Sequence, residues 1–276
     1  MKTALVVLGM HRSGTSSVAG TLSLLGAAAP KTLMAPADDN PRGFWESDVV
    51  MALNDAMLAE RGLSWSDWRA RVGRSAAVAD PRIATVMADE FGDAEQVVLK
   101  DPRLCRLFEE WRISLTAADY AVRVVIPIRA PAEVARSLTA RNPMTWEHGL
   151  RLWLRHVLDA ERASRGLPRH TMMWTDFLSD WRGQISRMNQ SLSVGLIADQ
   201  ESAAAVDTFL SDNLHRQRSH EPTPPLVRRA WRILSDMATH GDHPDLLSAL
   251  DAVRVEFDHA CTLFTDASPA LQAGSG

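Results

Sequence analysis

The sequence predicts an α/β fold in which helices flank a central parallel sheet, and two observations support this prediction. Several short, continuous apolar runs have the composition of strands that are buried on both faces. Stretches with helical periodicity follow these runs, and strands that alternate with helices form parallel sheets. No repeat or linker divides the 276 residues. We therefore expect one domain over residues 1–267, with a core at 1–195 and a helical C-terminal subregion at 196–267, before a disordered tail at 268–276.

Four strands are expected along the chain. The first is an aliphatic run that ends at Gly9, and the third consists mostly of Val and Ile. Continuous apolar runs of this length, bounded by turn residues, are typical of buried strands. The predicted strands cover residues 4–8, 96–99, 121–128 and 170–174.

The predicted helices begin and end at the usual residue types. Gly26 ends the first, and Asp80 followed by Pro81 has the pattern of an N-cap and a first helical residue. Beyond Asp176 the pattern is helical apart from a proline-rich break at 222–225. Up to that point, the predicted helices cover residues 15–25, 48–61, 81–91 and 146–164, with two more that follow Arg103 and Arg129.

Composition excludes several classes of protein. The chain has 30 basic and 34 acidic residues, a balance that argues against a nucleic-acid-binding protein. Two cysteines cannot form a disulfide framework, and no apolar run approaches the roughly 18 residues of a membrane span. We therefore expect a cytoplasmic protein. His240 and His243 lack a third ligand nearby, so no metal site is expected.

The strongest motif follows the first strand and opens the first helix. It reads Gly9-Met10-His11-Arg12-Ser13-Gly14-Thr15-Ser16. In this context a glycine-rich loop holds a phosphate with its backbone N–H groups. The loop of nucleoside-triphosphate enzymes reads G-x-x-x-x-G-K-[ST], but here Thr15 stands where that lysine belongs. Because Arg12 supplies a cation from a different direction, the sequence predicts a P-loop-type domain for another anion, with less need for magnesium.

These residues carry a resemblance to a known family. The loop, from Gly9 and His11 through Ser13, Gly14 and Ser16, resembles the 5′-phosphosulfate loop of sulfotransferases, specifically their bacterial carbohydrate-type branch. Three more segments agree with that branch over residues 1–195: Asn40-Pro41-Arg42-Gly43-Phe44-Trp45-Glu46, Leu99-Lys100-Asp101-Pro102-Arg103 and Arg129-Ala130-Pro131-Ala132-Glu133-Val134-Ala135-Arg136-Ser137. The resemblance implies 3′-phosphoadenosine 5′-phosphosulfate (PAPS) as donor and 3′,5′-adenosine bisphosphate (PAP) as product. It also implies a hydroxyl of a carbohydrate or a glycosylated small molecule as acceptor.

A donor with phosphate groups at two ends needs two anion sites. The loop at 9–16 supplies the first, and Arg129 with Ser137 would supply the second, for the 3′-phosphate. The branch usually has an acidic residue where this chain has Ala130. The segment 209–216 resembles the one that closes over the nucleotide, which would direct Arg216 or Arg218 at the same phosphate.

Three residues are candidates for the general base that takes the acceptor proton. We favour Glu46, because Phe44 and Trp45 beside it would exclude water and favour proton uptake. The alternative is that Glu46 caps a helix or binds an arginine. Asp101 is the second candidate, since it follows a strand at the sheet edge where substrates bind, and His11 is the third.

Lys100 is the predicted cation for the leaving group, together with Arg12. The alternative is a salt bridge between Lys100 and Asp101 or a neighbouring carboxylate, because a lysine at the end of a buried strand is usually paired. Trp65 and Trp68 either stack on a sugar ring or belong to the core. The helices within 226–264 either cover the sheet or form a homodimer.

Two other functions stay open at this point. One is an ATP- or GTP-dependent kinase, against which the missing lysine and the second anion site argue. The other is a catalytically inactive nucleotide-binding protein of the same fold.

Overall fold

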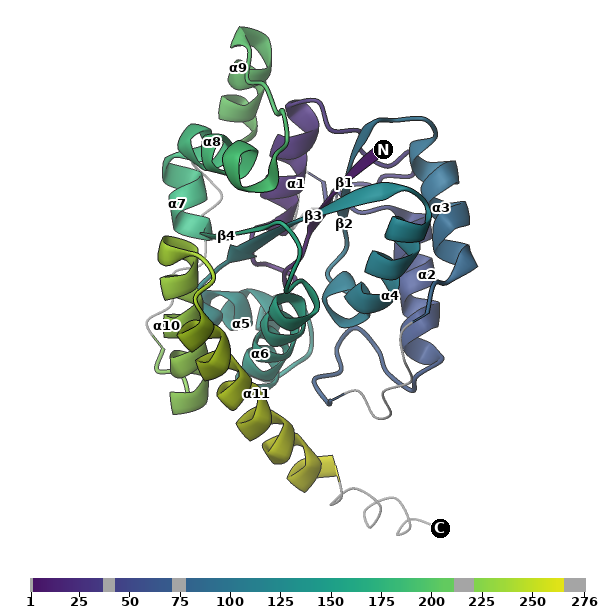
Figure 1. Ribbon diagram of the computed structural model, residues 1–276. Helices are drawn as coiled ribbons and strands as arrows, with labels where there is room; N and C mark the ends of the chain where they lie inside the picture. The colour runs from purple at the N-terminus through teal and green to yellow at the C-terminus, as the bar shows by residue number, and fades with distance from the viewer. Residues whose placement is uncertain (1, 37–42, 71–77, 211–220, 266–276) are drawn as a thin grey trace.

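The computed structural model describes residues 2–36, 43–70, 78–210 and 221–265, and at its centre lies a four-stranded sheet (Figure 1). All neighbouring strands pair in parallel, in the order β2-β1-β3-β4. The predicted α/β architecture, a central parallel sheet flanked by helices, is therefore confirmed. The strands are β1 (Lys2–Val7), β2 (Gln96–Lys100), β3 (Tyr120–Ile128) and β4 (Arg169–Met173).

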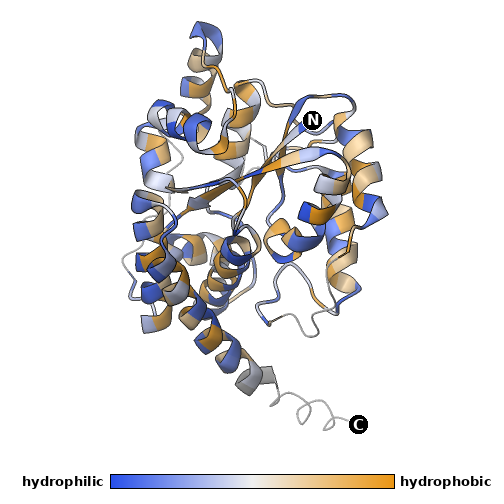
Figure 2. Cartoon of the chain, in the orientation of Figure 1, coloured by the Kyte–Doolittle hydropathy of each residue, from blue (hydrophilic) through white to orange (hydrophobic). Residues whose placement is uncertain are grey.

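Successive residues of β1 point to opposite faces of the sheet, as they must in a strand. Leu5 and Val7 belong to one buried apolar cluster, whereas Ala4 and Val6 belong to another. Both faces are therefore covered, which explains why the strand reads as a continuous apolar run. Figure 2 shows such strongly apolar strands between helices that carry hydrophilic residues on their outer sides.

Helices cover the two faces unequally. The face of Leu5 packs against α1 (Thr15–Leu24), α7 (Trp174–Ser179), α8 (Trp181–Leu192) and α9 (Gln200–Phe209). The opposite cluster takes its buried residues from α2 (Asp48–Ala59), α3 (Pro81–Phe91), α4 (Leu104–Ala117), α5 (Pro131–Thr139), α6 (Trp146–Ala163), α10 (Pro225–His240) and α11 (Pro244–Thr265).

Caps explain where two helices begin. The Asp80 carboxylate accepts a hydrogen bond from the backbone N–H of Arg82, and Pro81 is the first residue of α3, as predicted. The Asp180 carboxylate accepts a hydrogen bond from the backbone N–H of Gly183 and so caps the start of α8. This cap separates α7 from α8 within a stretch that was predicted to be helical without a break. No described helix combines the length and the apolar character that crossing a membrane requires. The tail predicted at 268–276 lies outside the described residues.

A charge cluster built around three buried arginines joins three helices on the more heavily covered face. Asp159 of α6 pairs with Arg106 of α4 at 2.8 Å, with Arg254 of α11 at 2.8 Å and with Arg155 at 3.5 Å. Arg155 also pairs with Asp258 at 2.5 Å. Burial alone would raise the pKa of Asp159, but the three arginine charges lower it. We call these five residues the Asp159 cluster.

The strand order places one switch point in the sheet. From β1 the chain passes to β2 on one side and then to β3 on the other. Ligands of open α/β sheets bind outside the carboxyl ends of the strands at such a point. The loop after β1 and Arg129 after β3 both lie there.

Candidate active site

Two glycines fix the shape of the loop after β1. Gly14 has a φ of 87°, and a Cβ atom there would lie 2.3 Å from the ring of Trp174. A Cβ atom on Gly9 would lie 2.7 Å from the Cγ2 atom of Thr15. Both positions therefore require glycine. Arg12 also has a positive φ, of 70°, which turns the backbone between the two glycines.

The end of this loop has the features of an anion site. Helix α1 begins at Thr15 with no side-chain cap at Gly14 and no acidic residue in its first turn. The Ser13 hydroxyl is buried, and it has no hydrogen-bond partner among the described residues. Uncapped N–H groups and a buried hydroxyl without a partner both fit a bound anion such as a phosphate. The loop thus fits the group that the sequence predicted for it.

The two predicted anion motifs meet in the structure. The Nε atom of Arg12 donates to the Ser137 hydroxyl at 2.7 Å, and Nη1 of Arg129 donates to the carbonyl oxygen of Arg12 at 3.0 Å. Arg129 also pairs with Glu133 at 2.9 Å. The ends of β1 and β3 therefore bring Arg12, Ser137 and Arg129 into one cluster. Arg216 and Arg218 lie outside the described residues, as do Asn40, Pro41 and Arg42 of the second motif.

Lys100 connects the loop to Glu46. Its Nζ atom donates to the carbonyl oxygen of Phe44 at 3.0 Å, to the hydroxyl of Ser16 at 3.3 Å and to the Glu46 carboxylate. Lys100 is 4% exposed and Glu46 is 3% exposed. The salt bridge considered for Lys100 thus forms, but its partner is Glu46, whereas Asp101 pairs with Arg103. Because Ser16 lies in the first turn of α1, the same contact places the ammonium next to the anion loop.

Asp101 follows Lys100 in the chain and is paired with Arg103. It is fully buried, its Oδ1 atom accepts a hydrogen bond from the backbone N–H of Arg103 at 2.7 Å, and its Oδ2 atom pairs with Arg103 at 3.3 Å. Burial, with a smaller contribution from the charge of Glu46, raises the pKa of Asp101 to about 6. Asp101 does not line the cavity described next, so its contacts orient Arg103 and the start of α4.

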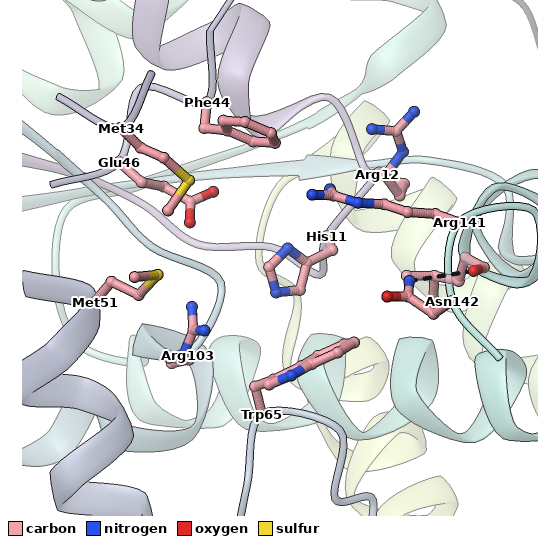
Figure 3. Close-up of a pocket in the computed structure, with 11 residues that line it drawn as sticks. His11, Arg12, Met34, Phe44, Glu46, Met51, Trp65, Arg103, Arg141 and Asn142 are labelled. Carbon is pink, nitrogen blue, oxygen red and sulfur yellow. Dashed lines mark hydrogen bonds between the residues drawn. The ribbon is translucent and has the colours of Figure 1, made fainter. Parts of the chain in front are cut away.

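A cavity of about 190 Å³ opens beside the loop, and Figure 3 shows the side chains around it. Glu46 lies on one side and His11 in the middle, above Trp65. The ring centroids of His11 and Trp65 are 5.1 Å apart in an edge-to-face arrangement. The lining residues are His11, Arg12, Met34, Phe44, Glu46, Met51, Trp65, Arg103, Leu138, Arg141 and Asn142.

His11 is neutral at physiological pH. Burial, followed by the charges of Lys100 and Arg103, holds the pKa of His11 well below its ordinary value of 6.5. Its Nε2 atom is buried and has no hydrogen-bond partner in the part of the chain that is described. A neutral imidazole nitrogen at a cavity wall can accept or donate one hydrogen bond, according to its tautomer.

Sequence reasoning missed several residues that line the cavity. Met34, Met51, Leu138, Arg141 and Asn142 come from segments far apart in the sequence, and none of them belongs to a motif. Trp65 was considered for stacking on a sugar or for the core: it packs against the larger apolar cluster and also lines the cavity, and stacking on a sugar stays a prediction. Trp68 packs against the same cluster. Among the described residues, no group of three or more His, Cys, Asp or Glu could hold a metal ion.

Comparisons with known proteins found limited similarity. No protein-family model matches the sequence, and no curated protein matches it. A sulfotransferase domain from the curacin biosynthetic pathway is 13% identical with a TM-score of 0.45, over 93% of this chain and 97% of that chain. A sulfotransferase domain from the olefin synthase of Synechococcus PCC 7002 is 13% identical with a TM-score of 0.46, over 88% of this chain and 96% of that chain. Likeness at this level carries no argument about activity, which must come from the residues of this chain.

Proposed function

We propose that this protein is a sulfotransferase that transfers a sulfuryl group from PAPS to a hydroxyl group. One observation supports this most strongly. The buried Lys100 contacts both Ser16 of the anion loop and Glu46 at the cavity. A single cation therefore connects a site built for a phosphate-like anion with a carboxylate able to accept a proton. In-line group transfer needs the donor site, a cation and a proton acceptor next to one another.

The anion loop supports binding of the donor. The N–H groups at the start of α1, the Ser13 hydroxyl and Arg12 would hold the phosphosulfate end, while Arg129, Ser137 and Arg216 would hold the 3′-phosphate. The lysine that a nucleoside-triphosphate enzyme carries in its loop is absent, and Lys100 from β2 provides the ammonium instead.

In PAPS an oxygen atom bridges the sulfur and the 5′-phosphate. During transfer the bond between sulfur and this oxygen breaks, and a bond between sulfur and the acceptor oxygen forms. PAP is the leaving group. Glu46 takes the acceptor proton, with Asp101 and His11 as weaker candidates for this role. Lys100 and Arg12 stabilise the negative charge that develops on the departing phosphate. No metal is needed in this scheme. We also propose, from the sequence, a carbohydrate or glycosylated acceptor and a cytoplasmic location.

Ligand-dependent thermal unfolding tests the donor assignment. A ligand that binds only the folded state stabilises it by about 2.7 kcal/mol at a hundredfold excess over its Kd. We expect PAP without magnesium to raise the melting temperature, and Mg-ATP to raise it much less. Lys100→Met should weaken the PAP effect, whereas the control Lys31→Met, at an exposed position, should leave it unchanged. Stabilisation by Mg-ATP alone would instead indicate a kinase, and no effect of either nucleotide would indicate an inactive relative.

A further inference from the structure

We propose that Trp45 and Glu90, neither of which lines the cavity, hold the Glu46 carboxylate at the cavity wall. Both are positioning residues, because each acts through a chain neighbour of Glu46. This inference rests on the proposed function, in which Glu46 takes the acceptor proton, and it adds what keeps that proton acceptor in place. A base must lie within hydrogen-bond reach of the proton, so a displaced carboxylate slows the reaction.

Glu46 depends on other elements for its position. It belongs to neither a helix nor a strand, and α2 begins only at Asp48. Its side chain lies at one side of the cavity (Figure 3) and pairs with Lys100. An irregular segment has no regular hydrogen-bond ladder of its own, so its backbone takes its partners from elsewhere in the fold.

The backbone is strained directly before Glu46. Trp45 has a φ of 56°, in the left-handed region that bulky residues rarely adopt. Such a conformation costs free energy and persists only where the surrounding contacts determine it. The indole of Trp45 must therefore make contacts that offset the strain.

These contacts come from α1 and α9. The indole of Trp45 meets the ring of Phe209 edge to face, with the ring centroids 5.7 Å apart. Both rings lie against Gly20 of α1, where a Cβ atom would come within 2.8 Å of Trp45 and 2.4 Å of Phe209. Only a residue without a side chain leaves room for this pair. Because α1 begins at the anion loop, the same contacts set the position of Glu46 relative to the donor site.

On the other side of Glu46, a chain of hydrogen bonds ends at Glu90 of α3. Glu90 is buried, and its carboxylate accepts from the hydroxyl of Thr32 at 2.9 Å and from the backbone N–H of Thr32 at 3.1 Å. Because an ionised carboxylate only accepts, Ser47 is the donor in the 3.0 Å bond between the Ser47 and Thr32 hydroxyls. The Ser47 oxygen in turn accepts from the backbone N–H of Val50 and caps α2.

The segment that Glu90 holds also pairs with the backbone around Glu46. The N–H of Met34 donates to the carbonyl oxygen of Glu46 at 2.8 Å, and the N–H of Asp48 donates to the carbonyl oxygen of Thr32 at 3.0 Å. Glu46 is thus held through Trp45 on one side and through Glu90 on the other.

Transfer of labelled sulfate from PAPS to methyl glucoside measures the effect on the reaction. Trp45→Ala and Glu90→Ala should each lower kcat at least tenfold, while the calorimetric Kd of PAP changes less than threefold. Trp45→Phe keeps an aromatic partner for Phe209 and should recover most of kcat. The controls are Trp231→Ala, from a partly buried aromatic pair on the other face of the sheet, and Glu161→Ala, a buried carboxylate of α6. Both should lower the melting temperature and keep kcat.

A double substitution separates positioning from a general loss of stability. If Trp45 and Glu90 act through Glu46, their removal should lower kcat less than twofold further once Glu46 is replaced by glutamine. A full further fall of kcat in the Glu46→Gln background would overturn the proposal. Wild-type kcat in the folded variants Trp45→Ala and Glu90→Ala would overturn it as well.

Hydrogen exchange tests the positioning without turnover. In Glu90→Ala, or in the milder Glu90→Gln if the first variant does not fold, the backbone amides of Met34 and Asp48 should exchange at least tenfold faster than in the wild type. Glu161→Ala should leave these rates unchanged. If the wild type transfers no sulfate from PAPS, the proposed function fails, and the exchange rates alone decide whether Glu90 holds this segment. Unchanged rates in a folded Glu90 variant would contradict the inference.

Discussion

Two histidines in this molecule both have lowered pKa values, but their surroundings differ. His11 and His156 both have an Nε2 atom that is buried without a hydrogen-bond partner in the described chain. Burial is the main cause that lowers both pKa values, with neighbouring cations as a further cause. His156, however, is fully enclosed and its Nδ1 atom donates to the carbonyl oxygen of Leu152 at 2.8 Å, whereas His11 lines a cavity.

The polar groups around the two histidines also differ in whether the protein itself provides their partners. Near His156, the Asp159 carboxylate is surrounded by three arginines of the protein itself. In the loop that holds His11, the buried Ser13 hydroxyl has no hydrogen-bond partner among the described residues, and α1 begins without a side-chain cap. A lowered pKa therefore does not distinguish a functional site from a structural one. The difference between the two histidines is the cavity, which His11 lines and His156 does not.

The largest effect is expected at Glu46. Glu46→Gln removes the proton acceptor while keeping the shape of the side chain, so sulfuryl transfer should fall by ~10²–10⁴-fold. Steady-state transfer of labelled sulfate measures this, and the melting-temperature increase caused by PAP should persist. The control Glu95→Gln lies at an exposed position and should behave like the wild type. Near-normal turnover in Glu46→Gln would mean that Asp101 or His11, and not Glu46, accepts the acceptor proton.

The Asp159 cluster should affect stability but not chemistry. Asp159→Asn leaves buried arginines without their shared carboxylate, which we expect to cost about 3–5 kcal/mol of unfolding free energy. Urea unfolding measures this loss, with Asp245→Asn, at an exposed position, as the control. Below the unfolding transition the variant should keep its PAP affinity. If the variant folds but loses PAP binding, the Asp159 cluster is not purely structural, and its contrast with the site around the anion loop does not hold.

The two histidines should make the protein sensitive to acid. The pKa of His156 is about 3 in the folded chain and about 6.5 when unfolded. Between these values the unfolded chain binds a proton that the folded chain does not, so stability present above pH 6.5 is lost as the pH falls. Each unit by which the pH falls within this window lowers the unfolding free energy by about 1.4 kcal/mol.

His156→Leu should therefore flatten the fall in unfolding free energy between pH 6.5 and pH 3, as measured by urea unfolding at several pH values. His259→Leu, at an exposed position, is the control. An unchanged pH profile in His156→Leu would show that this histidine is not buried as described.

The smallest effect is expected at Glu133. This carboxylate pairs with Arg129, which we propose to bind the 3′-phosphate. Glu133→Gln removes a negative charge next to that site, so PAP should bind about threefold more tightly, in line with the modest energy of such pairs. Calorimetric titration at low and high salt measures this, and the gain should shrink at high salt. Weaker PAP binding would mean that Glu133 holds Arg129 in its binding position.

The sequence allowed the sheet and the anion loop to be predicted because both have local signals. Apolar runs mark the strands, and the spacing of Gly9 and Gly14 marks the loop between β1 and α1. For Lys100 the sequence suggested Asp101 or another neighbouring carboxylate as the partner, but the partner is Glu46. Glu46 is 54 positions away along the chain, so their contact depends on how the segment before α2 folds over β2.

The cavity could not be predicted from local patterns. Met34, Met51 and Arg141 come from three segments that meet only in the folded chain, and methionine and arginine occur throughout this sequence. The break between α7 and α8 was missed for a different reason. Asp180 lies inside a stretch with helical character, and its role as an N-cap appears only once its carboxylate is seen to accept from Gly183.

Sulfuryl transfer itself is the most direct test of the central claim. The wild type, with PAPS labelled in the sulfuryl group, 4-nitrophenol and a panel of sugars, and with EDTA present, should release PAP in equal amount to the label found in the acceptor. Lys100→Met and Glu46→Gln should lose this transfer, and Lys31→Met should keep it. If the label never leaves PAPS while the γ-phosphate of Mg-ATP reaches an acceptor, the protein is a kinase and the account is wrong.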